Sequence, residues 1–199
     1  MATADSELST EEVQRRLPTL ELIDDPRTKA VTTRLSQTAP DYFWEVPASA
    51  SNYHHPACRG HRGLWAHTLM LSTVIDRLAD SYVGQGLITE HEVDYAHAAA
   101  ILHDQRKNGD PANPSETSVS DHDIRMAEVV AESALDDAIA AAIGTHMGCW
   151  YDGPEPESNL DQLVHTADMV ASTESITPGI QGPIPDELAE LGLEEVDLR

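Results

Sequence analysis

The stretch TEHEVDYAHAAAILHD, residues 89–104, contains the pattern that decides the fold class. Thr89 is followed three residues later by a glutamate, which is the capping-box pattern that starts a helix. Apolar side chains from Val93 to Ile101 then recur at helical spacing. The stretch ends on the doublet His103-Asp104. We therefore expect a buried helix whose C-terminal end carries two metal-binding types of side chain.

Similar helical patterns occur along most of the chain. We expect helices over residues 9–18, 25–35, 64–82, 120–130, 136–144 and 160–172, and a short one at 186–191. Residues 39–63, 105–119 and 148–158 are rich in proline, glycine or asparagine, which predicts irregular structure and a mobile loop at 105–119. No segment reads as a convincing strand. The sequence thus predicts an all-α fold, a single compact helical bundle with a short N-terminal helical extension.

The same patterns divide the chain into three segments. Residues 1–50 form the helical extension, residues 51–176 the core, and residues 177–199 a tail rich in proline and glycine. The extension could cover a site, form a dimer contact or pack beside the core helices. A homodimer is therefore one arrangement that the sequence leaves open.

Acidic residues dominate the composition. Asp and Glu number 35 against 12 Lys and Arg, the formal net charge is -23, and only Lys29 and Lys107 are lysines. This balance resembles proteins of salt-loving archaea and their viruses. Carboxylates keep a surface hydrated, and molar salt shortens the Debye length to about 3 Å and so mutes their repulsion. The same charge argues against a nucleic-acid-binding structural protein, because it repels a polyanion.

The sequence predicts a cytoplasmic protein without a membrane segment. No apolar run approaches the roughly 20 residues that cross a bilayer, and the N-terminal residues are too polar and acidic for a signal peptide. Cys58 and Cys149 form neither a disulfide framework nor a CxxC motif. We interpret them as unreactive thiols in a reducing compartment.

The ten histidines carry the chemical information. A lone histidine among apolar residues is usually a core residue, and we interpret His91, His97 and His165 in that way. An ordered set is different. Histidines and aspartates close or punctuate successive apolar helical segments at His67, His103, Asp104, His122, His146 and Asp168.

This ordered set resembles the HD-domain superfamily of metal-dependent phosphohydrolases over about residues 53–172. The family pattern is H…HD…D, and binuclear members add two intervening histidines. The resemblance implies a set of metal ligands, namely His67, His103, Asp104, His122, His146 and Asp168. It also implies catalytic roles for Asp104 and Lys107, because Lys107 completes the form HDxxK.

Local context adds to the resemblance. The stretch YHHPACRGHRGLWAHT, residues 53–68, is similar to the "HH…GGLLEHT" entry found in phosphodiesterase and exonuclease-like members. His122 precedes an Ala127-Glu128 pair, and Asp168 follows Ala167, as in the family. The chain departs from the pattern at Ala66, where a glutamate is common, and after His146, where it reads Met-Gly.

Imidazole and carboxylate ligands together suit Mn, Fe, Co, Ni or Zn ions. His103 and Asp104 are about 100° apart on a helix, so His103 can bind one ion while Asp104 bridges to a second. Two ions about 3.5–4 Å apart would activate a hydroxide and clamp the phosphate. With one ion, the ligands would be His67, His103, Asp104 and Asp168, which would leave His122 and His146 for the phosphate.

The few cations gather around these segments. Their positions predict a phosphate-binding rim made of Lys107, Arg62, Arg106 and Arg125, with Arg59. The alternative is that these cations form surface ion pairs with the many carboxylates. His54 and His55 either line the mouth of the site or lie in an exposed loop. Trp150 and Tyr151 either stack a base or anchor the packing.

The sequence therefore predicts an enzyme that cleaves a phosphate ester of a nucleotide or nucleic acid. A binuclear phosphodiesterase with two divalent transition-metal ions fits the ligand set best. A one-metal nucleoside 5′-monophosphate phosphatase is the alternative within enzymes. A non-catalytic nucleotide-sensing module is the alternative outside them.

Overall fold

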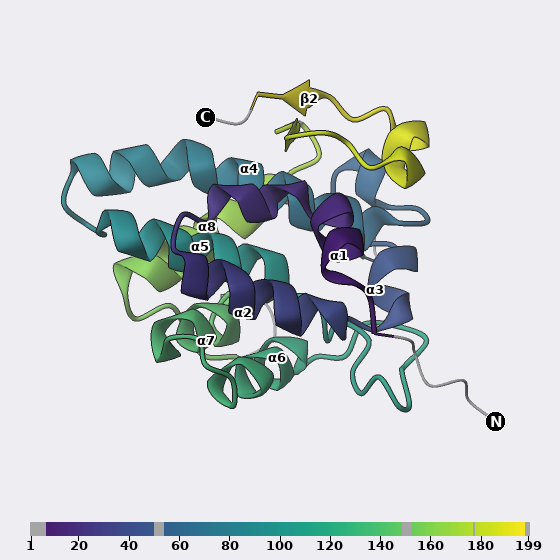
Figure 1. Ribbon diagram of the computed structural model, residues 1–199, viewed down its shortest axis with the longest axis horizontal. Helices are drawn as coiled ribbons and strands as arrows, with labels where there is room; N and C mark the ends of the chain where they lie inside the picture. Colours follow the sequence, from purple (N-terminus) through teal and green to yellow (C-terminus); the bar gives the residue numbers. More distant parts are fainter. Residues whose placement is uncertain (1–6, 50–53, 149–152, 177, 198–199) are drawn as a thin grey trace.

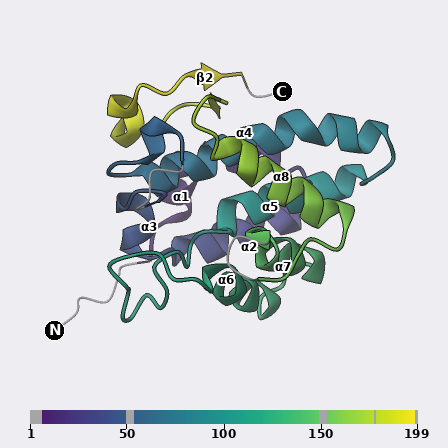
Figure 2. The same ribbon diagram turned by 180° about the vertical axis from the view of Figure 1, so that it is seen from behind.

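The computed structural model describes residues 7–49, 54–148, 153–176 and 178–197. The long helix α4 (Gly63–Gly84) and helix α5 (Glu90–Leu102) lie side by side, and α8 (Asn159–Ala171) packs against α4 (Figure 1). Helices α6 (His122–Ala131) and α7 (Asp137–Gly144) form a pair across the end of α5. The reverse view in Figure 2 shows α8 lying over α4 and α5. The predicted all-α helical bundle is confirmed.

Helix α5 follows its sequence pattern closely. The Thr89 hydroxyl accepts from the Glu92 backbone N–H, and the Glu92 carboxylate accepts from the Thr89 N–H, so the capping box is present. Alanines at 96 and 98–100 are fully buried, and their small side chains let neighbouring helices approach closely. The helix ends at its C-cap, His103.

Helix α4 is buried over its first half, from Gly63 to Ile75. Its start has one required residue: a Cβ at Gly63 would lie 2.0 Å from the backbone oxygen of Cys58. The preceding Arg62 has a left-handed backbone, with φ of 65°. The chain therefore enters α4 through a tight turn that packs residues 54–62 directly on the helix.

The other predicted helix starts are close to those observed. Asp136 caps α7 with its side chain. Asp121 is the N-cap of α6 and makes no side-chain capping bond. The cap of α8 is Ser158, one residue before the predicted Asn159, and Asp161 completes its capping box. Loop 105–119 is rich in turns and is closed by backbone hydrogen bonds such as Val119 to Lys107; its mobility stays a prediction.

The N-terminal segments wrap one side of the bundle. They are α1 (Thr10–Arg16), the 3₁₀ helix η1 (Pro18–Leu22), α2 (Pro26–Gln37), α3 (Asp41–Glu45) and the 3₁₀ helix η2 (Pro56–Cys58). The expectation that residues 39–63 are irregular is wrong for α3 and η2. Burial of Phe43 and Trp44 stabilises the short α3, and Trp44 packs edge-to-face on Trp65 of α4.

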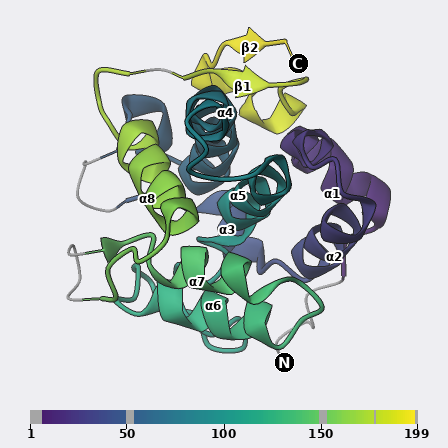
Figure 3. The ribbon, with the colours of Figure 1, turned by 90° about the vertical axis from the view of Figure 1, so that its left-hand side faces the viewer.

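The C-terminal tail crosses α4 (Figure 3). Strand β1 (Ile180–Gln181) pairs in parallel with β2 (Glu195–Val196), and the 3₁₀ helix η4 (Asp186–Leu191) lies between them. This short pair is a departure from the expectation of no strand. Buried Gln181 fastens it, because its backbone N–H donates to Thr73 and its side chain donates to Asp76 of α4. In the described part of the chain, every helix is too short or too polar to span a bilayer.

Candidate metal centre

Six side chains from five different segments meet inside the bundle. His67 comes from the second turn of α4, and His103 and Asp104 come from the end of α5. The others are His122 at the first position of α6, His146 after α7 and Asp168 on α8. Five of them are at most 1% exposed. Asp168 is the exception, with 14% of its side chain exposed. The cluster is therefore accessible to solvent next to Asp168.

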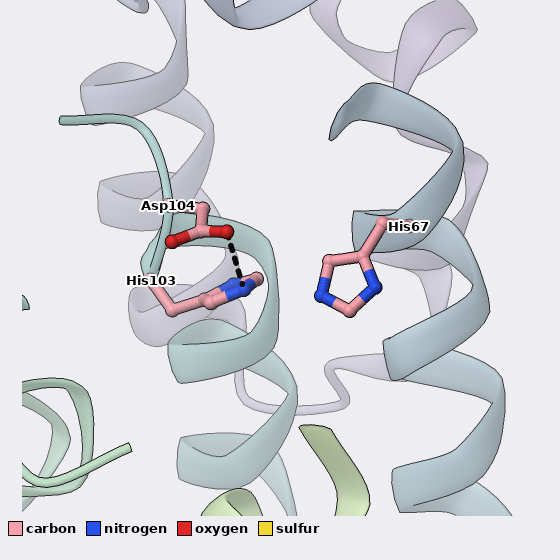
Figure 4. A group of neighbouring side chains, drawn as sticks. All are labelled: His67, His103 and Asp104. Atoms are coloured by element: carbon pink, nitrogen blue, oxygen red, sulfur yellow. Dashed lines mark ion pairs between the residues drawn. The ribbon is translucent and has the colours of Figure 1, made fainter. Parts of the chain in front are cut away.

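The six residues form two groups that share one carboxylate. His67, His103 and Asp104 bring one ligand-type atom each within 4.8 Å of one another, and so do Asp104, His122 and His146. Figure 4 shows the first group, with one ring nitrogen of His67 facing the other two residues. The Asp104 oxygens divide between the groups: Oδ2 lies 3.3 Å from His103 Nε2, and Oδ1 lies 3.1 Å from His122 Nε2.

Backbone carbonyls set the tautomers of three of these histidines. The Nδ1–H groups of His103, His122 and His146 donate to the carbonyl oxygens of Ala100, Val119 and Ile143, at 2.7–2.8 Å. A carbonyl only accepts, so the proton of a neutral ring is on Nδ1. Each Nε2 therefore presents a lone pair to the centre of the cluster, as metal-binding imidazoles do.

This arrangement fits a cation. The Nε2 atoms of His103 and His146 and the Oδ1 atom of Asp104 are buried and lack hydrogen-bond partners among the described residues. His146 Nε2 lies 3.7 Å from that Asp104 oxygen. Facing lone pairs in a buried site repel one another unless a proton or a metal ion lies between them. The buried lone pairs of both groups are therefore compatible with bound metal ions.

Charges in the cluster reinforce one another. Burial alone would raise the pKa of Asp104, but Lys107 and His103 outweigh it and hold that pKa well below the usual range. Burial alone would lower the pKa of His103, yet the Asp104 carboxylate raises it. The Lys107 ammonium donates to Asp104 Oδ2 at 2.8 Å. Asp104 is thus an ionised carboxylate inside the protein.

Asp168 completes the group around His67. Its Oδ1 atom lies 2.9 Å from His67 Nε2. Burial would raise the pKa of Asp168, but its interaction with the adjacent His67 ring lowers it strongly. Asp168 is therefore ionised as well. The structure brings all six predicted ligands together.

Comparison with known protein families gives one match. The family model described as HD domain matches residues 64–173, more than half of the chain. This chain belongs to the HD domain family. No curated protein and no solved structure matches it. HD domains are generally metal-dependent hydrolases that bind divalent metal ions, and the buried His and Asp groups of this one are compatible with that chemistry.

The predicted phosphate-binding rim of the HD domain is only partly assembled. Of its five cations, Lys107 alone contacts one of the six residues within the described part of the chain. Arg62 donates to the backbone oxygen of Glu187 in the tail, and Arg125 pairs with Asp121 on the surface. Arg106 donates to the carbonyl of Gln105, and burial lowers its pKa. Substrate binding by these arginines stays a prediction.

Two further histidines, His54 and His165, lie near the cluster but are not part of the ligand pattern predicted from the sequence. The ring of His54 lies 4.8 Å from that of His67, and burial lowers the pKa of His54 to about 3. The ring of His165 donates through Nδ1 to the backbone oxygen of His146 at 2.7 Å. The sequence signal for the proximity of His165 to the cluster is its position three residues before Asp168, on the same face of a helix.

The remaining residues that the sequence analysis discusses either lie apart from the cluster or fall outside the described residues. Cys58 is a free, buried thiol whose pKa burial raises to about 12, as expected for an unreactive cysteine. Cys149, Trp150 and Tyr151 lie outside the described residues. The interpretation of His91 as a core residue is wrong, because 58% of its side chain is exposed. It borders a surface cavity of about 410 Å³ that contains none of the six ligand-type residues.

Proposed function

We propose that this HD domain is a phosphohydrolase with two metal ions that cleaves a phosphodiester of a nucleotide or nucleic acid. One observation carries the proposal: two buried groups of ligand-type atoms share Asp104, and each group faces a different oxygen of that carboxylate. A bridging carboxylate between two imidazole sets is a frame for two ions. A single ion would use only one of the two groups.

The proposal assigns a ligand role to each of the six residues. His67, His103 and Asp168 would hold one ion, His122 and His146 the other, and Asp104 both. The mixed imidazole and carboxylate donors suit Mn, Fe, Co, Ni or Zn ions. When bound, such ions act as Lewis acids and lower the pKa of water, so that it attacks phosphorus at neutral pH.

Lys107 is proposed to meet the substrate. It is 7% exposed and lies against Asp104, so its ammonium can turn between the carboxylate and a phosphate oxygen. A cation in a buried site stabilises the charge that develops on a phosphoryl group during transfer. Arg62, Arg106 and Arg125 are proposed to contribute to phosphate binding at greater distance.

The number of ions tests the proposal. Protein purified in molar KCl without chelator is measured for metal content by plasma mass spectrometry. We expect close to two transition-metal ions per chain, and close to one in His122→Ala. His91→Ala is the matched control, because His91 is exposed and belongs to neither group. A value near one that survives His122→Ala would favour the one-metal nucleotidase.

Activity then separates the remaining alternatives. We expect the two-metal protein to hydrolyse phosphodiesters faster than nucleoside 5′-monophosphates, and His122→Ala to abolish this activity. Metal binding without turnover on either substrate class would instead identify a non-catalytic nucleotide-sensing module. Protein that takes up no metal after addition of Mn²⁺, Ni²⁺ and Fe²⁺ would contradict both enzyme proposals.

Four further expectations accompany this function. We propose a cytoplasmic location and adaptation to high salt, the second of which the composition favours. A homodimer stays open as the assembly. The division at residues 50 and 176 also stays a prediction, although the described part of residues 1–50 packs into the same core as the helices.

A further inference from the structure

One proposed ligand lacks the support that the others have. His103, His122 and His146 each donate through Nδ1 to a backbone carbonyl three residues earlier. The Nδ1 atom of His67 is buried and has no hydrogen-bond partner among the described residues. Metal-binding imidazoles are normally oriented by a hydrogen bond from the nitrogen that does not bind the metal. Something else must orient His67.

The tautomer of His67 matters because of Asp168. A proton on Nε2 would point at the Asp168 carboxylate, 2.9 Å away, and would occupy the lone pair that a metal needs. A proton on Nδ1 leaves Nε2 open toward the cluster. His67 therefore needs a hydrogen-bond acceptor on its Nδ1 side.

The imidazole of His54 is the neighbour that can supply this acceptor. Its ring meets that of His67 edge-to-face, with an interplanar angle of 83° and centroids 4.8 Å apart. Its own Nδ1 atom is also buried without a hydrogen-bond partner in the described part of the chain. Two adjacent imidazoles thus each carry a buried, unsatisfied Nδ1. The two Nδ1 atoms do not hydrogen-bond each other in this edge-to-face arrangement. An imidazole accepts through one nitrogen and donates through the other, so a turn of the His54 ring would let the pair satisfy each other.

The loop that carries His54 is held in place. Arg59 donates through Nε to the backbone oxygen of His54 at 2.7 Å, and its Nη2 atom lies 3.3 Å from Glu174 beyond α8. Cys58 donates its backbone N–H to His55 at 2.8 Å. At the other end of the loop, Gly63 packs against Cys58 with no space for a side chain. The position of His54 is therefore set by contacts with both α4 and the end of α8.

We propose that His54 is a positioning residue for His67, which accepts the Nδ1 proton of His67 and so turns its Nε2 lone pair toward the metal. The inference rests on the proposed function of the cluster as a metal centre. It adds a seventh side chain, which the six-residue ligand pattern omits. It also gives a function to the first histidine of the pair His54-His55.

Cobalt binding to the full chain tests this role. Three variants are compared with wild type by visible absorption and by competition with a chelator. His54→Phe keeps a ring but removes the acceptor, and His54→Gln keeps an acceptor. His61→Phe is the control, because His61 lies exposed in the same loop. We expect His54→Phe to weaken one Co²⁺ site roughly 10–100-fold and change its spectrum, His54→Gln to recover most of the affinity, and His61→Phe to match wild type.

The tautomer itself gives a second readout that needs no metal. Long-range ¹H–¹⁵N NMR on histidine-labelled, metal-free protein reports which nitrogen of His67 is protonated. We expect more of the Nδ1-protonated form in wild type and His54→Gln than in His54→Phe. An unchanged tautomer in His54→Phe, or unchanged Co²⁺ affinity and spectrum, would overturn the proposal. Wild-type protein that binds no Co²⁺ would contradict the metal centre, while the tautomer would still decide the role of His54.

Discussion

Two equally buried histidines of this protein have pKa values shifted in opposite directions. His97 is fully enclosed in α5, and burial alone lowers its pKa to about 4. His103, further along the chain at the C-cap of the same helix, is equally buried, but Asp104 raises its pKa. The difference lies in the neighbours: a histidine without a charged partner stays neutral in the core. At the buried His103, the charged partner is Asp104 of the proposed metal centre.

His97 should make the fold sensitive to acid. Its pKa is about 4 when folded and 6.5 in the reference state, so the unfolded chain binds a proton that the folded chain does not. Stability is then lost as pH falls from 6.5 toward 4, by about 2 kcal/mol at pH 5. Urea denaturation at pH 7 and pH 5 should show a smaller loss in His97→Met than in wild type. Equal losses in the two proteins would contradict this assignment.

Lys107 should affect activity more than metal binding. In Lys107→Met, Asp104 loses its cation, but its carboxylate still faces both groups of histidines. We expect kcat/KM for a phosphodiester to fall roughly 100-fold, about 2.7 kcal/mol, with the metal content unchanged. Lys29→Met is the control, because Lys29 pairs with Glu21 near the surface. Loss of metal from Lys107→Met would show that Lys107 positions Asp104 instead of meeting phosphate.

At the scale of elements, the proposed ligands lie mainly where helices begin or end. His103 caps α5, His122 opens α6 and His146 follows α7. Helix ends free the backbone to turn, which lets the neighbours His103 and Asp104 serve the same cluster. His67 and Asp168 are the exceptions, because they project from within α4 and α8. Contact between these two helices therefore sets their separation.

The start of α4 should tolerate no side chain at residue 63. A Cβ there would lie 2.0 Å from the Cys58 carbonyl oxygen and 2.5 Å from its carbon, and backbone atoms cannot move aside as a flexible side chain can. We expect Gly63→Ala to reduce the unfolding free energy by about 3 kcal/mol. Gly60→Ala, with nothing within 4 Å of its Cβ, should change it by less than about 0.5 kcal/mol. Denaturant titration measures both, and similar values for the two variants would refute the steric argument.

At the scale of the whole molecule, the two terminal segments meet on α4. Arg15 of α1 makes two hydrogen bonds to the carboxylate of Glu187, at 2.6 and 2.7 Å. Arg62 donates to the backbone oxygen of the same residue. Arg16 lies over the rings of Trp44 and Trp65. Cations are scarce in this chain, and several of them join segments that are distant in sequence.

The net charge of -23 should make stability depend on salt. Screening reduces the repulsion between surface carboxylates, which is greatest in the compact folded state. We expect Tm to rise by roughly 5–10 °C between low salt and molar KCl, or about 2–3 kcal/mol. Sucrose at matched osmolality, which screens no charge, should raise it less. A Tm that falls or stays constant with KCl would contradict a repulsion-limited fold.

The sequence by itself determined the helical class, the capping box of α5 and the ordered series of histidines and aspartates. These features depend on caps and periodicity, which involve residues within one or two turns of each other. The tertiary structure alone decided the rest: the helix α3, the pairing of β1 with β2, the division of the Asp104 oxygens between two groups, and the contact of His54 with His67. Each of these joins segments far apart in the chain or depends on burial against them. Their distances follow from how the helices pack, which no local pattern encodes.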